Sequence, residues 1–378
     1  MENSFKILPL GLYVHYPFCI RKCPYCDFNS YGEGSDSDRD ILYFRRLKTD
    51  FSKALEEQNL KGRRFKSVYI GGGTPSLADT DLISEFLNFI SGSLDSSVEI
   101  SMECNPGTVD LNKLKAIKAA GVNRLSIGVQ SFNSASLKRL GRIHDAESAK
   151  NAVESAVKAG FTDLNVDLMH GLPNQTASEA LSDLKQALEL GATHLSWYEL
   201  TIEEDTKFGR HPPVLPSEDE LADIEKEGFA FLSSSGFVHY EVSGFYKNKP
   251  CLHNLNYWNF GDYLGIGAGA HSKLFRDGQT LRRAQIERPA DYMQRKDAAF
   301  SAVPASDVPF EFMLNRLRIF NEIAASEFTQ TTALPFSMVE KQLHKAESKG
   351  LVEFTENGYR ISQLGRLMLN DVLELFLP

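Results

Sequence analysis

Cys19-Ile20-Arg21-Lys22-Cys23-Pro24-Tyr25-Cys26 is the stretch of sequence that decides which fold and chemistry this chain predicts. It holds three thiols within eight residues and directly follows an apolar run over residues 11–18 that is typical of a strand. Thiolates so close in sequence can converge on one metal centre, and soft sulfur ligands suit iron–sulfur clusters, zinc or copper(I). The sequence therefore predicts a sulfur-ligated metal centre on a loop that leaves a strand.

The spacing of the cysteines favours an iron–sulfur cluster over zinc. A closed structural zinc site needs a fourth ligand, and after Cys26 the next cysteine is Cys104, in a different apolar run. His15 could serve only if its strand residue turned toward the loop. Tight spacing in a chain without a secretory signal points to a cluster. Zinc and unligated thiols stay open as alternatives.

Composition limits the class of protein. The chain has 378 residues, enough for one large domain and a smaller one, and its net charge of -9 argues against a nucleic-acid partner. It has no apolar run of about 18 residues, and its first residues lack the core of a signal peptide. Its five cysteines do not suggest a secreted disulfide framework. We expect a cytoplasmic protein.

Strand and helix patterns alternate through the first half of the chain. The helical patterns carry cap signals: Asp110 and Asp145 can begin helices, and Thr176 to Glu179 is a capping box. Alternation of this kind means a parallel sheet with right-handed crossovers, either a TIM-like barrel or a doubly wound sheet. Because glycines and polar residues follow the strands, we expect an α/β fold with a partial (β/α)6 TIM-like barrel over residues 1–205. The six β-type runs are residues 11–18, 67–70, 98–102, 124–129, 164–169 and 194–198.

The second half of the chain breaks this alternation. Residues 206–305 predict an α+β extension packed against the barrel, with a hairpin signal at Asp277-Gly278. Residues 306–378 predict helices followed by a small hairpin, a winged-helix-like domain whose mixed charges favour docking over DNA binding. We expect the apolar tail over residues 372–377 to pack in a core rather than touch a membrane or a partner.

The cysteine motif, with Tyr25 before the last cysteine, resembles the signature of the radical S-adenosylmethionine (SAM) superfamily. The resemblance implies that Cys19, Cys23 and Cys26 hold a [4Fe-4S] cluster, reduced by an electron donor, whose open iron chelates SAM. It also implies that the Gly-Gly-Gly-Thr loop after the second strand contacts the amino group of SAM. Carboxylates and a guanidinium suit the remaining polar groups of such a ligand. The SAM-contacting set implied is Tyr13, Gly72, Gly73, Thr74, Glu103, Gln130, Arg142 and Asp167.

A closer resemblance covers nearly the whole chain. Residues 11–19, 128–132 and 167–173 resemble motifs of the oxygen-independent coproporphyrinogen III oxidase branch, which also contains the haem chaperone family HemW. The oxidase carries a fourth cysteine where this chain has Phe28, and it has a longer N-terminal segment, whereas only eighteen residues precede Cys19 here. Both departures favour the chaperone family and put oxidase or decarboxylase turnover in doubt.

A second motif supports the chaperone family. His253-Asn254-Leu255-Asn256-Tyr257-Trp258 matches a His-Asn-x-x-Tyr-Trp motif that is tied to haem binding in that family, with His253, Asn254, Tyr257 and Trp258 as the motif residues. Imidazole is a common axial ligand of haem iron, and the two aromatic rings offer flat surfaces for a macrocycle. His271 is a second candidate with a more structural character. We expect Cys104 to be a buried small hydrophobe, and we do not favour Cys251 as a haem ligand.

The resemblance implies a haem-binding chaperone that delivers haem to acceptor proteins such as respiratory-chain enzymes. It leaves open a homodimer and a location peripheral to the inner membrane. Two enzyme alternatives remain: oxidative decarboxylation of coproporphyrinogen III, and modification of another tetrapyrrole by radical SAM chemistry.

Overall fold

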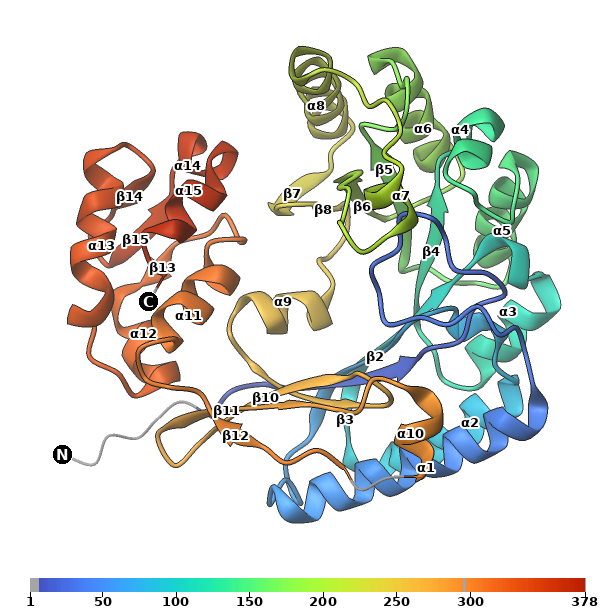
Figure 1. Ribbon diagram of the computed structural model, residues 1–378, viewed down its shortest axis with the longest axis horizontal. Helices are drawn as coiled ribbons and strands as arrows, with labels where there is room; N and C mark the ends of the chain where they lie inside the picture. The colour runs from blue at the N-terminus through green and yellow to red at the C-terminus, as the bar shows by residue number, and fades with distance from the viewer. Residues whose placement is uncertain (1–6, 295–296, 378) are drawn as a thin grey trace.

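Six parallel strands lie side by side in chain order at the centre of one curved sheet (Figure 1). The structure, a computed structural model, describes residues 7–294 and 297–377. All six predicted β-type runs are confirmed, so the alternation of strand and helix was interpreted correctly. The strands are β1 (Leu10–Tyr16), β2 (Phe65–Gly72), β3 (Leu94–Cys104), β4 (Arg124–Gln130), β5 (Leu164–His170) and β6 (His194–Glu199).

Helices cover the outer face of this sheet (Figure 1). The predicted cap signals are confirmed. The side chain of Asp110 accepts a hydrogen bond from the backbone amide of Lys113, and Thr176 forms a capping box with Glu179. Local hydrogen bonds therefore fix where these crossover helices begin. The helices are α1 (Ser37–Glu57), α2 (Thr80–Ile90), α3 (Leu111–Ala119), α4 (Ser134–Arg139), α5 (Ala146–Lys158) and α6 (Ala177–Glu189).

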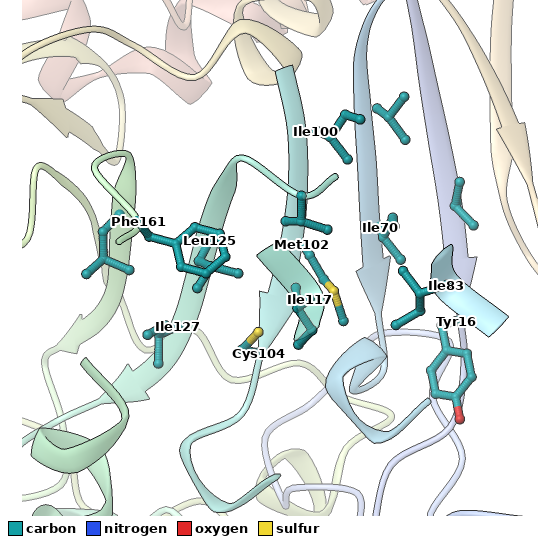
Figure 2. Close-up of a cluster of buried hydrophobic side chains, with 14 of the residues drawn as sticks. Tyr16, Ile70, Ile83, Ile100, Met102, Cys104, Ile117, Leu125, Ile127 and Phe161 are labelled. Carbon is teal, nitrogen blue, oxygen red and sulfur yellow. The ribbon is translucent and has the colours of Figure 1, made fainter. Parts of the chain in front are cut away.

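The core lies between the sheet and these helices. Figure 2 shows Met102 of β3 beside Ile117 of α3, and Ile127 of β4 belongs to the same cluster. Cys104 lies in the same cluster, and burial raises the pKa of its thiol to about 12. Its expected role as a buried small hydrophobe is confirmed.

Strands of the extension lengthen the sheet at both ends. β9 (Asp262–Ile266) pairs in parallel with β1, and β10 (His271–Arg276), β11 (Gln279–Ala284) and β12 (Ser301–Ala302) continue the sheet in antiparallel fashion. At the other end β8 (Gly244–Tyr246) pairs with β6, and β7 (Val238–Glu241) pairs with β8. The extension therefore pairs with both edges of the six-stranded unit, whose backbone N–H and C=O groups would otherwise lack partners. Its helices are α7 (Lys207–Arg210), α8 (Glu218–Ser234), α9 (Leu252–Trp258) and α10 (Pro289–Gln294).

The C-terminal residues form a separate three-stranded sheet and a second hydrophobic cluster, to which Phe260 of the extension also belongs. Val372 and Phe376 of the tail are buried in that cluster, as expected. Among the described residues, no helix has both the length and the apolar composition needed to cross a membrane. The elements are α11 (Val308–Arg316), β13 (Ile323–Ala324), α12 (Ala325–Thr332), α13 (Ser337–Ser348), β14 (Val352–Phe354), β15 (Gly358–Ile361), α14 (Gln363–Leu367) and α15 (Leu369–Glu374).

Candidate functional site

The cysteine loop leaves the carboxyl end of β1, where the backbone holds it in place. The amide of Cys19 donates to the carbonyl of Tyr31 at 2.8 Å, and the amide of Thr74, beyond β2, donates to the carbonyl of Phe18 at 2.9 Å. Cys19 is buried, whereas Cys23 and Cys26 are half-buried. Burial raises the pKa of the thiols of Cys19 and Cys26. Both thiolates therefore need a cationic partner, such as a metal centre, to form at neutral pH.

The donor set suits an iron–sulfur cluster. Three thiols from one loop supply the soft sulfur ligands that such a cluster uses. Cys23 and Cys26 line a cavity of about 740 Å³, and Arg142 Nη1 donates to Cys23 Sγ at 3.4 Å. Three thiols, open space and a neighbouring positive charge together suit a cluster.

The glycines after β2 have a packing role that the sequence left open. Gly72 has a φ of +113°, and a Cβ atom there would lie 2.4 Å from the His15 ring. A Cβ atom at Gly73 would lie 2.7 Å from the carbonyl carbon of Pro17. These two glycines therefore let the end of β2 close on the end of β1, beside the cysteine loop. Thr74 is buried at the same place.

Two carboxylates lie on the inner side of the sheet, Glu103 within β3 and Asp167 within β5. Glu103 accepts the amide of Gly72 at 2.9 Å. Burial raises its pKa to about 7, and the nearby charge of Asp167 also raises it. Asp167 accepts hydrogen bonds from Ser126 and Asn165 at 3.0 Å and 2.7 Å. Burial thus favours the neutral carboxyl of Glu103, whereas a cationic ligand would favour the ionised form.

Gln130 and Arg142 lie near the end of β4. Gln130 is the last residue of this strand, has a φ of +69°, and accepts a hydrogen bond from Tyr198 at 2.7 Å. Arg142 follows α4 and donates to the carbonyl of Gly128 at 2.7 Å. It thereby fills the space between β4 and the cysteine loop.

The predicted haem motif forms α9, a short helix that the sequence did not reveal. His253 is 1% exposed, and its two ring nitrogens are both hydrogen-bonded, Nδ1 to Ser67 and Nε2 to Tyr257, each at 2.9 Å. Burial lowers the pKa of this imidazole to about 3. His253 is therefore neutral and fully engaged within the protein. It contacts Tyr257 and is absent from the lining of the cavity to which Tyr257 and Trp258 belong, and its role in haem binding stays a prediction.

Glu99 holds the start of α9, a role that no local sequence signal indicates. Its carboxylate accepts the amides of Leu252 at 3.0 Å and His253 at 3.3 Å. The thiol of Cys251 lies 3.5 Å from the same oxygen, and burial raises the pKa of that thiol to about 12. Cys251 is thus buried against Glu99.

One cavity of about 520 Å³ brings the two predicted sites together. Tyr13, Gly72 and Glu103 of the predicted SAM set line it, and so do Tyr257 and Trp258 of the predicted haem motif. The volume lies within the usual range for sites that bind small molecules. Phe28 and His271 also line this cavity, whereas Gly73, Thr74, Gln130, Arg142, Asp167, His253 and Asn254 do not.

Comparison with known proteins gives the family. Residues 13–187 match the Radical SAM superfamily, and residues 303–368 match the HemN C-terminal domain. The chain is 44% identical to "Heme chaperone HemW" of Haemophilus influenzae, over 98% of this chain and 99% of that one. It is 45% identical to "Heme chaperone HemW" of Escherichia coli, with the same shares covered. The solved structure of coproporphyrinogen III oxidase (HemN) from Escherichia coli matches with a TM-score of 0.81 and 25% identity, over 99% of this chain and 91% of that one.

These matches agree with the geometry of the site. The radical SAM superfamily implies a [4Fe-4S] cluster and SAM, which suit the three thiols on the loop after β1. The similarity to these two curated relatives extends over nearly the full length of both chains. The chain belongs to the heme chaperone HemW family of radical SAM proteins.

Proposed function

We propose that this chain is a haem-binding chaperone on a radical SAM scaffold, which binds haem and delivers it to acceptor proteins such as respiratory-chain enzymes. The observation that carries the proposal is the shared cavity, in which Tyr257 and Trp258 face the same space as Phe28 of the cysteine loop. Aromatic rings offer flat apolar surfaces to a porphyrin. The names of the curated relatives support the same function.

The proposal divides the site between two ligands. Cys19, Cys23 and Cys26 hold the [4Fe-4S] cluster, which supplies an open iron for SAM when it is bound. For SAM we propose contacts from Tyr13, Glu103 and their neighbours, because both residues line the cavity and an ionised Glu103 would pair with an ammonium group there. The full set proposed for SAM is Tyr13, Gly72, Gly73, Thr74, Glu103, Gln130, Arg142 and Asp167.

The aromatic wall of the haem site is fixed before any ligand binds. Tyr257 and Tyr263 make an edge-to-face ring contact with centroids 4.4 Å apart. Arg318 lies over the ring of Trp258 at 4.4 Å. A wall that is already ordered costs less conformational entropy when haem binds. Within the motif, Tyr257 and Trp258 contact the macrocycle in this proposal, and His253 and Asn254 support them.

The proposal also includes partners and a location. An electron donor would reduce the cluster, and two copies of the chain could pair as a homodimer. The chain would act in the cytoplasm or at the surface of the inner membrane.

Phe28 is the residue that separates this proposal from the oxidase alternative. The oxidase has a cysteine at that position, whereas here an aromatic side chain that is 62% exposed lines the cavity. Phe28 therefore adds a further apolar surface for a flat ligand in the haem cavity.

A haem titration tests the proposal. Cluster-reconstituted protein is titrated with haem under anaerobic conditions, and the Soret band is followed to saturation for the unaltered chain, Trp258→Ala and the control Phe89→Ala, an exposed aromatic on α2. We expect saturable binding that weakens only in Trp258→Ala, and transfer of chemically unmodified haem to an apo-haem protein. Non-saturable binding, or turnover of coproporphyrinogen III with SAM and a reductant, would contradict the proposal.

A further inference from the structure

Three histidines lie at or behind the haem cavity, and hydrogen bonding distinguishes them. His15 is buried, with Nδ1 against the Tyr13 hydroxyl at 2.8 Å and Nε2 against the carbonyl of Asn29 at 2.9 Å. His253 also has both nitrogens engaged. An imidazole needs one nitrogen with a free lone pair to bind haem iron. Neither of these residues offers one.

His271 differs from both. It is the first residue of β10, its side chain is exposed, and it lines the same cavity as Tyr257 and Trp258. Within the described part of the chain, its ring has no hydrogen bond, ion pair or aromatic contact. Of the three histidines, it alone combines access to the cavity with unengaged nitrogens.

The backbone around His271 is firmly held. A Cβ atom at Gly265 of β9 would lie 2.0 Å from the His271 carbonyl oxygen, so the two strands approach closely. Just before β10, the side chain of Asn29 donates to the carbonyl of Ala268 at 3.0 Å and thereby ties this turn to the cysteine loop. An imidazole on such a rigid support is pre-positioned for a ligand.

We propose that His271, rather than His253, supplies the axial nitrogen to the iron of haem bound in this cavity. The inference rests on the proposed function and adds the iron ligand to it. Tyr257 and Trp258 contact the porphyrin in this arrangement, and His253 holds the Tyr257 hydroxyl in place. His253 is then a positioning residue and His271 the ligand.

A histidine nitrogen bound to haem iron has its own spectroscopic signature. Spectra of haem bound to variants therefore show whether His271 or His253 is the axial ligand. Haem is added anaerobically to the unaltered chain, His271→Ala, His253→Ala and the control His344→Ala, an exposed histidine on α13. Resonance Raman and electron paramagnetic resonance spectra report a nitrogen ligand, and the Soret titration reports affinity. Cluster absorbance and thermal melting establish that each variant is folded.

We expect His271→Ala to lose the nitrogen-ligand signature and to bind haem about tenfold or more weakly. Added imidazole should restore the signature in His271→Gly, because the vacated space admits a free ligand. We expect His253→Ala and His344→Ala to keep it. A folded His271→Ala that keeps the signature overturns this inference and leaves the proposed function standing. Absence of saturable haem binding in the unaltered chain overturns both.

Discussion

Arg142 Nη1 donates a hydrogen bond to Cys23 Sγ at 3.4 Å, although 119 residues separate the two along the chain. The other terminal nitrogen of this guanidinium donates to the carbonyl of Gly128 at 2.7 Å, next to the end of β4. A fixed positive charge thus lies against one of the three thiols. Charge and hydrogen bonding at cluster sulfurs are among the factors that set reduction potentials.

Arg142→Gln should lower the reduction potential of the reconstituted cluster by tens of millivolts. Reduction adds negative charge, and the substitution removes a neighbouring positive charge that stabilises it. A redox titration followed by electron paramagnetic resonance measures the change. Arg21→Gln is the matched control, because Arg21 is an exposed residue of the same loop that donates to backbone carbonyls of Gly141 and Arg142. Equal potentials in Arg142→Gln and the unaltered chain would contradict this prediction.

Glu99→Ala should loosen α9 and weaken haem binding without affecting the cluster. The Glu99 carboxylate is 2% exposed and accepts the amides of Leu252 and His253. Its loss leaves the buried amide of His253 without a partner, at a cost of about 1–3 kcal/mol. Hydrogen exchange of the α9 amides and the haem titration measure the effect. Glu99→Gln keeps an oxygen acceptor and should lose less; equal losses in the two variants would show that charge, not hydrogen bonding, holds the helix.

His253→Ala should lower the free energy of unfolding by about 2–4 kcal/mol even in the absence of haem. The substitution removes a buried ring and its hydrogen bonds to Ser67 and Tyr257. Tyr257→Phe removes only one of these hydrogen bonds and should cost about 1–2 kcal/mol. Chemical denaturation of the haem-free protein measures both. Full stability in His253→Ala would mean that this histidine is retained for ligand contact alone.

The parts of the fold that depend on local signals could be predicted from the sequence. The apolar run of β4 and the Asp145 cap of α5 could be predicted because each signal lies within a few residues. α9 was not predicted, since it has seven residues and its N-terminus is held by Glu99 from a distant strand. The parallel pairing of β9 with β1 was missed for a similar reason, because it joins segments that are far apart in the chain.

The same distinction between local and distant signals applies to the residues of the candidate site. The three cysteines and Glu103 follow strands or motifs that the sequence displays. The role of His253 depends on Ser67, 186 residues away, and no local pattern reveals that hydrogen bond. Sequence reasoning therefore ranked His253 above His271 as a ligand, whereas the structure buries the first and exposes the second.

Glu103 should make the stability of the cluster-free protein fall as pH rises. Burial raises the pKa of this carboxyl from 4.5 to about 7 in the folded state, so between these values the folded chain binds more protons than the unfolded chain. The contribution is complete below pH 4.5 and is lost by about pH 7, with a total of at most about 3 kcal/mol. Glu103→Gln does not titrate, so the difference in unfolding free energy between it and the unaltered chain should change over this range. Denaturation at several pH values measures this difference, and a pH-independent difference would contradict the raised pKa. SAM, if its ammonium group lies beside Glu103, should favour the ionised carboxyl, and its affinity should therefore rise through pH 7 in the unaltered chain but not in Glu103→Gln.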